Sequence, residues 1–504
     1  MKFVLVFILL LRYYSSFSQA AGTLDATFGD NGIKERPFAT VNMHILPDEK
    51  MLINSLNLMR LNPDCSIDSS FGIDGVSAAY SGIFDVFPDG RIAISSLVEE
   101  VPNGILNVLK VTVLHPNGMV DLTYGINGEA RLVFPKGISI AGIVCHPNGT
   151  IFAAGSIYNS SPTSLKSDLY VTRFTTGGVA DIGGAPYWIP DPYDFTPSLE
   201  NFNFNFSSGL CLQPDGNVVL CGAVSGYTGT VYQNYRRFYL HRFLPDGAHD
   251  LSFGYNGHLL DQIGSESTAY SVLTTSDNFI YAVGISDNNA SVVAKYNTDG
   301  DRVSSYGIQG AAKISGILCR RFTRQPDGKI VVVGTLSTSS PDLVVARLKV
   351  NGTLDPSFSD DGISSIPYDP DIAYYPNDIE MLSTGKILVS GRKMTPGGMF
   401  ARFNSALFVA AKEPFAKEIQ KAVMIPNQLI NQTQVTVQYH INERVDQDAV
   451  IVYSNGHLEP VQVESNGDGD SLTAQIPEHL ASGVYHLLFM DGSVPVRATF
   501  VKVR

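Results

Sequence analysis

The sequence predicts an all-β protein, a seven-bladed β-propeller followed by a small immunoglobulin-like β-sandwich. Three observations support this fold class. Three short phrases recur in a fixed order along most of the chain, and each recurring unit holds about four strand patterns separated by turn residues. Only 16% of the 504 residues are charged, whereas Gly (46), Tyr (23) and Phe (27) are plentiful, a composition that suits strands and turns.

The first phrase is GTLDATFGDNG at residues 22–32, which returns as GTLDPSFSDDG at residues 352–362. Self-similarity at intervals of 43 to 69 residues indicates a repeat architecture. The seven copies, of which the fourth is decayed, begin at positions 22, 65, 118, 178, 247, 300 and 352.

The second phrase is a turn followed by an apolar run, as in PDGKIVVVG at residues 326–334. Pro presets φ and Gly takes the left-handed position, so this phrase predicts a hairpin. The third phrase is an alternating strand centred on a cation, with Val113 replacing the cation in the second unit. The cations are Arg60, Arg173, Arg242, Lys295, Arg347 and Arg402.

The seventh unit ends at residues 401–406 without a following first phrase, whereas every earlier cation strand is followed by one. The copy at residues 22–32 has no preceding unit. We therefore expect the N-terminal phrase to supply the missing strand of the last blade, so that a propeller of residues 21–408 closes on itself.

These phrases are similar to the delta-60 repeat family, and the resemblance covers about residues 22–405. It implies a secreted bacterial β-propeller without an activity common to its members. The decayed phrase near Asp181 and the substitutions Val113 and Val303 depart from the pattern.

Recurring Asp and aromatic residues of the first phrase could line a channel with charge or form a stacking platform. A residue repeated in every blade is better explained as framework, with each Asp bonding its turn or a nearby cation and each ring packing between blades. These residues are Asp25, Asp68, Asp121, Asp181, Asp250 and Asp355, with Phe28, Phe71, Tyr124, Phe253, Tyr306 and Phe358.

Residues 1–20 resemble a secretory signal peptide, with Lys2, a short apolar run and small residues before a cleavage site after Ala20. The alternative is an uncleaved anchor, but the run is about half the length that spans a bilayer. We expect no transmembrane segment in the mature chain. Cys211 is predicted to lie opposite Val219 rather than Cys221, which disfavours a disulfide between the two cysteines.

Residues 409–421 form a predicted linker, and residues 422–504 contain several short alternating strands. The segments LASGVYHLLF (480–489) and FVK (500–502) resemble the C-terminal type IX secretion (Por) sorting domain of Bacteroidetes cargo proteins. This resemblance implies the type IX secretion machinery as a partner and a secreted or outer-membrane surface location, reached through the periplasm. The alternative is an ordinary accessory binding module.

The formal net charge of −13 disfavours nucleic acid as a partner, and we expect a monomer. No catalytic or metal-binding motif stands out, so we predict no catalytic residues, no metal ligands and no cofactor. One exception is NGDGDS (466–471), which alternates oxygen side chains as calcium loops do but lacks the bidentate Glu.

Two segments interrupt the repeat, at residues 183–206 and 368–378. Loops that project from a rigid β scaffold often carry binding residues, and aromatic rings suit carbohydrate or protein contacts. The alternative is that these rings cap an exposed blade. The candidate ligand-binding residues are Tyr187, Trp188, Tyr193, Phe195, Tyr374 and Tyr375.

Three functions therefore remain open. The first is a non-enzymatic binding or adhesion scaffold for a carbohydrate or a protein. The second is a secreted propeller enzyme, a polysaccharide lyase or hydrolase, which would need non-repeating His, Asp or Glu residues at the channel. The third is a structural role in a surface layer or stalk.

Overall fold

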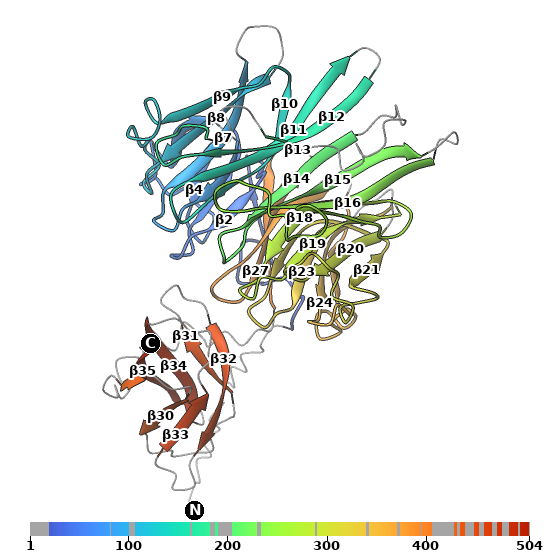
Figure 1. The fold of residues 1–504 in the computed structure, drawn as a ribbon. Coiled ribbons are helices and arrows are strands. Elements are labelled where there is room, and N and C mark those ends of the chain that lie inside the picture. The colour runs from blue at the N-terminus through green and yellow to red at the C-terminus, as the bar shows by residue number, and fades with distance from the viewer. Residues whose placement is uncertain are drawn as a thin grey trace, which may run out of the picture.

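A computed structural model describes residues 20–405 with short gaps, and seven further strands between residues 428 and 502. The gaps are residues 81, 100–105, 162–163, 182–186, 190–203, 229–232, 288–289, 339–341, 370–372 and 395. The described chain consists of strands and turns without a helix, and it contains no helix able to cross a membrane. The prediction of an all-β protein with a seven-bladed propeller is confirmed (Figure 1).

The first three blades run in chain order, each as an antiparallel sheet. The first contains β2 (Met43–Ile45), β3 (Met51–Asn54), β4 (Asn57–Leu61) and β5 (Val76–Tyr80). The second contains β6 (Ile83–Val86), β7 (Ile92–Glu99), β8 (Leu106–Leu114) and β9 (Glu129–Val133). The third contains β10 (Ile138–Cys145), β11 (Ile151–Ser161), β12 (Ser164–Phe174) and β13 (Tyr187–Ile189).

The next three blades repeat this order, and one parallel pairing, Ser167 with Phe204, joins the third blade to the fourth. The fourth contains β14 (Phe204–Leu212), β15 (Val218–Thr228), β16 (Gln233–Phe243) and β17 (His258–Asp261). The fifth contains β18 (Ser267–Thr274), β19 (Ile280–Ser286), β20 (Ala290–Tyr296) and β21 (Ala311–Ser315). The sixth contains β22 (Ile317–Arg324), β23 (Ile330–Leu336), β24 (Leu343–Leu348) and β25 (Ile363–Ile366).

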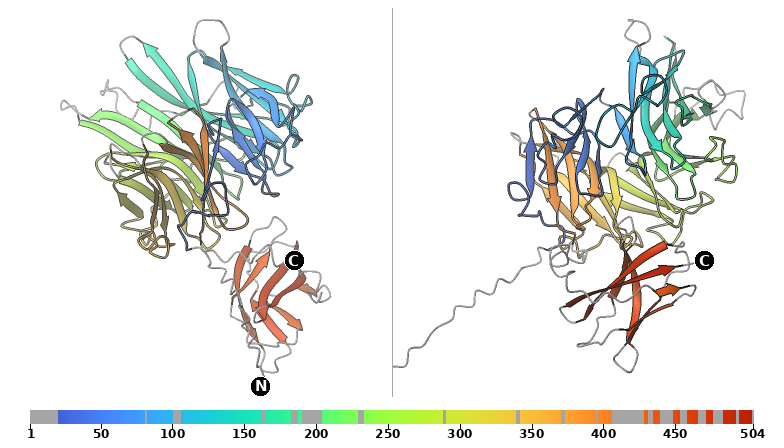
Figure 2. Two further views of the ribbon diagram at one scale, coloured as in Figure 1. Left: turned by 180° about the vertical axis from the view of Figure 1, so that it is seen from behind. Right: turned by 90° about the vertical axis from the view of Figure 1, so that its left-hand side faces the viewer.

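The seventh blade is built from both ends of the repeat region. Its strands are β26 (Tyr374–Met381), β27 (Ile387–Lys393), β28 (Gly398–Phe403) and β1 (Ile33–Arg36). β1 pairs antiparallel with β28, with Ile33 opposite Ala401, so the N-terminal strand is the outer strand of the last blade (Figure 2). The ring is therefore closed by main-chain hydrogen bonds between distant parts of the chain.

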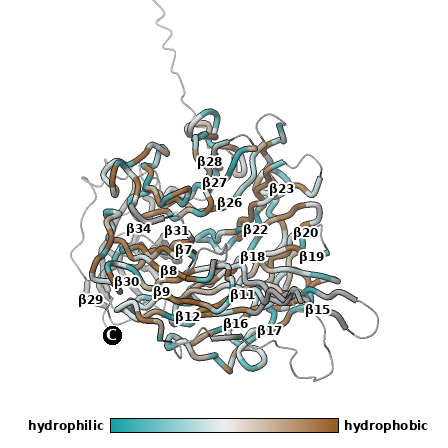
Figure 3. Tube along the Cα trace, turned by 90° about the horizontal axis from the view of Figure 1, so that it is seen from above, coloured by the Kyte–Doolittle hydropathy of each residue, from teal (hydrophilic) through white to brown (hydrophobic). Residues whose placement is uncertain are grey.

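The hydrophobic core lies between neighbouring blades rather than within one. In β23 the run Ile330–Val333 is buried on both faces: Val332 packs with Tyr281 of the fifth blade, and Val331 packs in the cluster that holds Ile379 of the seventh. Side chains alternate between the two faces of a strand, so a middle strand needs a continuous apolar run to serve both neighbours. Hydrophobic residues accordingly run along strands such as β7 and β8 (Figure 3).

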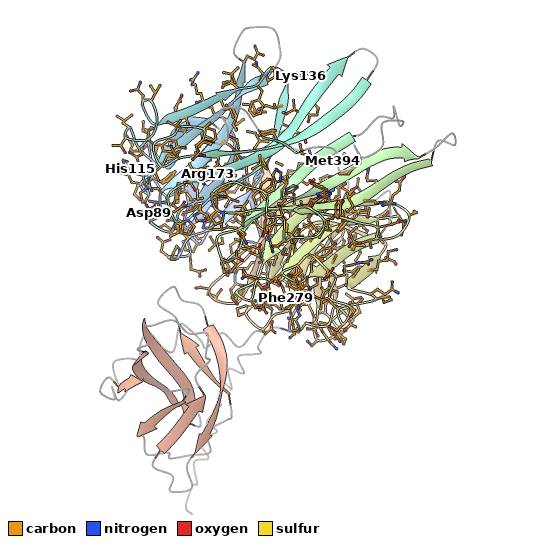
Figure 4. The ribbon with its side chains drawn as sticks, viewed as in Figure 1. Asp89, His115, Lys136, Arg173, Phe279 and Met394 are labelled. Carbon is orange, nitrogen blue, oxygen red and sulfur yellow. The ribbon has the colours of Figure 1, made fainter. Side chains whose placement is uncertain are left out.

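A repeated group, here called the clasp, contains the cation of the third strand with the Asp and aromatic ring of the first phrase. In five blades an arginine nitrogen lies 2.5 to 2.9 Å from an aspartate oxygen. The pairs are Arg60–Asp68, Arg173–Asp181 (Arg173 labelled in Figure 4), Arg242–Asp250, Arg347–Asp355 and Arg402–Asp25. The recurring charges are thus framework.

Four of the five clasps also join two blades, because the arginine donates to a carbonyl of the next blade. The Arg60 guanidinium lies over the Phe71 ring at 4.9 Å and donates to the Pro116 carbonyl of the next blade. Arg242 repeats this with Phe253 at 4.7 Å and with the Thr298 carbonyl. The aromatic residues of the phrase are therefore packing anchors that hold the cation beside the neighbouring turn.

The turns of the second phrase have the hydrogen bonds and backbone angles that the sequence predicts. The Phe87 amide donates to the Arg91 carbonyl and the Gly90 amide donates to the Phe87 carbonyl, and Gly90 has a φ of 85° that favours glycine. Cys211 lies opposite Val219, as predicted, and all five cysteines are free thiols.

Seven strands are described in the C-terminal segment, in the order β29-β35-β34-β31-β32-β33-β30. They are β29 (Gln428–Ile430), β30 (Gln434–Gln438), β31 (Asp448–Val452), β32 (Leu458–Ser465), β33 (Ser471–Gln475), β34 (Gly483–Asp491) and β35 (Val494–Lys502). The immunoglobulin-like sandwich stays a prediction, and the linker 409–421 and most of the possible calcium loop lie outside the described residues.

Candidate ligand site in the central channel

The first strand of each blade forms the wall of the central channel. These inner strands contact one another around the ring, for example β10 with β14, β22 with β26, and β26 with β2. In each of them one residue opens the following turn through a hydrogen bond from its amide to the carbonyl four residues on. These turn-opening residues are Leu46, Phe87, His146, Gln213, Thr275, Gln325 and Leu382.

The seven inner strands can be aligned on their turn-opening residues, with each position named by how many residues it precedes the turn. The residue three before it packs between blades, as Phe84 and Ile379 do, whereas the residues two and four before it are mostly half-exposed on the channel side. In blades three to seven a β-bulge precedes the residue four before the turn, for example between Pro376 and Asp378. Bulges redirect side chains, and here they set the residues that follow toward the channel.

Two rings of channel residues result, and neither follows the repeat. The first ring, four residues before the turn, contains Asn42, Ile83, Gly142, Gly209, Ser271, Arg321 and Asp378. The second ring, two residues before the turn, contains His44, Asp85, Val144, Cys211, Leu273, Thr323 and Glu380. Of these, Val144, Cys211 and Leu273 also pack in the hydrophobic clusters between blades. Charged and strongly polar residues come from blades six, seven, one and two, whereas blades three to five supply small or apolar ones. The channel is therefore chemically two-sided.

Asp378 and Glu380 are two residues apart in β26, so both lie on the same face of the strand. Asp378 accepts hydrogen bonds at Oδ2 from the Met43 amide (2.8 Å) and at Oδ1 from the Ile379 amide (3.0 Å). Burial raises the pKa of Asp378, with an opposing effect from Arg321. Burial, and then the negative charge of Asp378, raises the pKa of Glu380 to about 8. At neutral pH Glu380 can therefore donate a proton or a hydrogen bond.

Asp85 and His44 occupy the same ring on the next two inner strands. Asp85 Oδ2 accepts a hydrogen bond from the Cys145 amide (2.7 Å), and burial raises the pKa of Asp85. Burial lowers the pKa of His44, which favours its neutral form. A neutral imidazole offers one donor and one acceptor to a ligand.

A cavity of about 580 Å³ opens beside these residues. Its wall comes from β2, β6, β10 and β14 with the turns that follow them, and it includes His44 and Asp85. Apolar residues make up most of the remainder, among them Phe87, Leu210 and Leu212. This size and this mixture of an apolar wall with a few polar groups are typical of small-molecule sites.

The candidate residues from the two interrupting segments that the structure describes lie on strands and do not line this cavity. Tyr187 and Trp188 belong to β13, the outer strand of the third blade, where Trp188 pairs with Tyr170, so this part of the segment is not a projecting loop. Tyr193 and Phe195 lie outside the described residues.

Tyr374 and Tyr375 also belong to a strand, β26, rather than to the loop that we expected. The Tyr374 hydroxyl donates to Glu35 of β1 (2.7 Å), and Arg392 lies 5.2 Å from the centre of the Tyr375 ring. The bulge after Pro376 explains the error, since it interrupts the alternation that would identify the strand.

Sequence reasoning missed Arg321, Asp378, Glu380, His44 and Asp85. The available signal was their departure from the repeat at two fixed distances before the turn. No set of three or more described His, Cys, Asp or Glu side chains is arranged to hold a metal ion.

Comparison with known proteins agrees with the fold. The model of a family described as "Domain of unknown function (DUF5122) beta-propeller" matches residues 213–253 and 325–358. These segments fall in the fourth and sixth blades, so the match and the seven-bladed ring together support the propeller assignment. No curated protein matches the chain.

Solved structures resemble the chain only distantly. A protein of unknown function from Dyadobacter fermentans is 13% identical, with a TM-score of 0.37, over 74% of this chain and 99% of that one. The Synechocystis apocarotenoid oxygenase is 12% identical, with a TM-score of 0.36, over 62% and 70%. A Bombyx mori GH32 β-fructofuranosidase is 10% identical, with a TM-score of 0.27, over 70% and 84%. Likeness at this level does not assign a function.

Proposed function

We propose that this protein is an exported β-propeller that binds a carbohydrate or a protein, and that its ligand site is the two-sided central channel. One observation carries the proposal: two non-repeating polar residues on neighbouring inner strands, His44 and Asp85, line a cavity of about 580 Å³, whereas the repeated charged residues pair with one another in the clasps. A cavity of this size favours a carbohydrate unit over a folded protein surface.

Export is proposed from the two chain ends. Residues 1–20 would direct the chain to the periplasm, and residues 422–504 would carry it through the type IX machinery to the outer-membrane surface or the medium. Fusing residues 422–504 to a periplasmic reporter should deliver the reporter to the cell surface. Retention of the reporter in the periplasm would contradict this part of the proposal.

Binding is tested with the full-length protein on a glycan array. We expect selective binding that His44→Ala and Asp85→Asn each reduce at least tenfold without a large drop in melting temperature. The matched control is Ile308→Ala, since Ile308 is 81% exposed at a turn of the fifth blade. If Trp188→Ala removes binding and the two channel variants do not, the ligand site lies at the third blade instead.

A second candidate function is a secreted polysaccharide lyase or hydrolase. The observation that favours it is the row Glu380, His44 and Asp85 at one level of three successive blades, because general acid–base catalysis needs such unique titratable groups. Incubation with the polysaccharides that bind should then release reducing ends or unsaturated products. Glu380→Gln should abolish this release while leaving binding within a few-fold of the original protein.

A further inference from the structure

The wall of the cavity beside the inner strands is mostly apolar. It extends from β2, β6, β10 and β14 to the exposed prolines of three successive turns, Pro47, Pro88 and Pro147, so the cavity opens to solvent at these turns. Of its described lining residues, only His44 and Asp85 have strongly polar side chains. The apolar lining includes Leu46, Phe87, Ile143, Leu210 and Leu212. A ligand in this cavity therefore meets apolar surface on most sides.

The framework uses the carboxyl group of Asp85. Asp85 Oδ2 accepts a hydrogen bond from the Cys145 amide at 2.7 Å, and the Val86 amide also donates to this carboxyl group. The first bond joins β6 to β10, and a carboxyl group that turned toward a ligand would leave a buried backbone donor unpaired. Asp85 is therefore a positioning residue, which fixes the wall of the cavity.

His44 is the polar side chain that remains available. It is half-exposed and lines the cavity, and its imidazole forms no hydrogen bond or ion pair with any described residue. Burial lowers the pKa of His44, which favours the neutral imidazole with one donor and one acceptor nitrogen. The described part of the cavity thus combines an apolar wall with one free hydrogen-bonding side chain.

This lining does not suit an unsubstituted sugar. A sugar ring carries hydroxyl groups on most of its carbon atoms, and each hydroxyl group that is buried against an apolar wall without a hydrogen-bond partner costs binding free energy. An aromatic ring with a single hydroxyl group presents two apolar faces and one polar atom. Such a ring matches a wall of Leu, Ile and Phe side chains that holds one imidazole.

We propose that the cavity holds a phenolic substituent carried by a carbohydrate, with the phenol hydroxyl hydrogen-bonded to His44 and the sugar ring at the mouth, between the exposed prolines. This inference rests on the proposed function and specifies its ligand class. The phenol hydroxyl donates to the acceptor nitrogen of the imidazole. Pro47 and Pro88 offer flat apolar surface to the CH face of the sugar, whose hydroxyl groups stay in water.

The test compares three probes, p-hydroxyphenyl, phenyl and methyl β-glucoside, by titration calorimetry on the full-length protein at pH 7. The phenyl glucoside is expected to bind roughly tenfold more tightly than the methyl glucoside, because its ring leaves water for an apolar wall. The hydroxyl group should add about another fivefold through its hydrogen bond to His44. Equal binding of the phenyl and methyl glucosides would overturn the inference.

His44→Phe separates the hydrogen bond from the apolar contact. Phenylalanine keeps an aromatic ring in the wall but has no hydrogen-bonding nitrogen, so the variant should bind the p-hydroxyphenyl and phenyl glucosides equally. The matched control is His115→Phe (His115 is labelled in Figure 4), which lies outside the cavity lining with its Nε2 atom 3.8 Å from Asp121. The control should keep the preference for the hydroxyl group. A preference that survives in His44→Phe would contradict the role of His44.

A second measurement does not depend on any variant. In saturation-transfer NMR of the p-hydroxyphenyl glucoside with the unmodified protein, the aryl protons should receive more saturation than the sugar protons, because the aryl ring lies inside the cavity and the sugar at its mouth. The reverse pattern would place the sugar in the cavity and overturn the inference.

The outcomes separate the inference from the proposed function. Array binding confined to glycans without an aryl group would overturn the phenolic ligand and leave the carbohydrate site in place. Free hydroquinone that binds as tightly as its glucoside would show that the sugar contributes nothing, and would reject a carbohydrate as the ligand. Failure of every glycan and glucoside to bind would reject the proposed function itself.

Discussion

Arg402 and Asp25 are 377 residues apart in sequence, yet Arg402 Nε lies 2.6 Å from Asp25 Oδ2. The same carboxylate accepts a hydrogen bond from Lys386 Nζ, and the Asp25 amide donates to the Arg402 carbonyl at 2.7 Å. This clasp joins the two ends of the ring. The stability of the propeller should therefore depend on it more than on any single surface contact.

Deleting residues 21–33 is expected to abolish cooperative folding of the whole ring. The deletion removes Asp25, Phe28 and the first residue of β1, so β28 would lose its pairing with Leu24 and Ile33 and the core of the last blade would open. Circular dichroism and differential scanning calorimetry measure the result. A truncated chain that melts like the full-length protein would show that closure does not hold the ring together.

Asp25→Asn should make the free energy of unfolding depend less on pH under acidic conditions. Burial tends to raise the pKa of Asp25, but hydrogen bonds from Lys386 and Thr27 and the charge of Arg402 outweigh it and lower the pKa to about 2. A carboxyl whose pKa falls on folding stabilises above its unfolded pKa, and this contribution is lost as the pH drops from about 4 to about 2. The substitution should cost about 2 kcal/mol at pH 7 in urea unfolding. The exposed Asp30→Asn is the control and should change little.

Arg347→Lys should destabilise the protein although it keeps the charge. Arg347 is buried, pairs with Asp355, donates to Ser357 (2.9 Å) and to the Ser405 carbonyl, and lies over the Phe358 ring at 4.8 Å. Lysine cannot reproduce this planar fork, so we expect a loss of about 2–4 kcal/mol.

The matched control for Arg347→Lys is Arg131→Lys. Arg131 makes an exposed ion pair with Glu129 at 3.0 Å, so its replacement should cost less than about 0.5 kcal/mol. Equal effects of the two substitutions in denaturant unfolding would contradict the role assigned to the clasp.

The fourth blade should be sensitive to mild acid. The Tyr239 hydroxyl bonds His241 Nδ1 (2.7 Å), His241 Nε2 lies 2.5 Å from His249 Nδ1, and the rings of His241 and His258 stack. Burial lowers the pKa of all three histidines, with a further contribution from their mutual repulsion for His241 and His249. Groups with a lowered pKa in the folded state stabilise above their unfolded pKa of about 6.5 and lose this effect as the pH falls below it.

The melting temperature is therefore expected to fall between pH 7 and pH 5, and His241→Phe should reduce this pH dependence. If His241→Phe leaves the change of melting temperature with pH unaltered, the histidine cluster does not cause the acid sensitivity.

The repeated parts of this structure could be predicted from sequence, and the unique parts could not. The turn that Gly90 completes and the pairing of Arg60 with Asp68 follow from phrases that recur with the same chemistry. Glu380 and His44 carry no such signal, because neither residue recurs in the other blades. For Glu380, which residues of β26 share a face also depends on a bulge that no residue type marks. The same bulge made Tyr374 and Tyr375 read as loop residues.

The seam between Gly22 and Asn404 joins the first and the last residues of the ring. The Gly22 amide donates to the Asn404 carbonyl, and the Asn404 amide donates to the Thr23 carbonyl. The first residues of the ring are synthesised long before β28, so they cannot pair with that strand until the last blade has been translated. Because the two ends of the ring meet there, the propeller should tolerate circular permutation. A short linker would join the two ends at the seam, new termini would be placed at an exposed turn, and a different strand would then pair last.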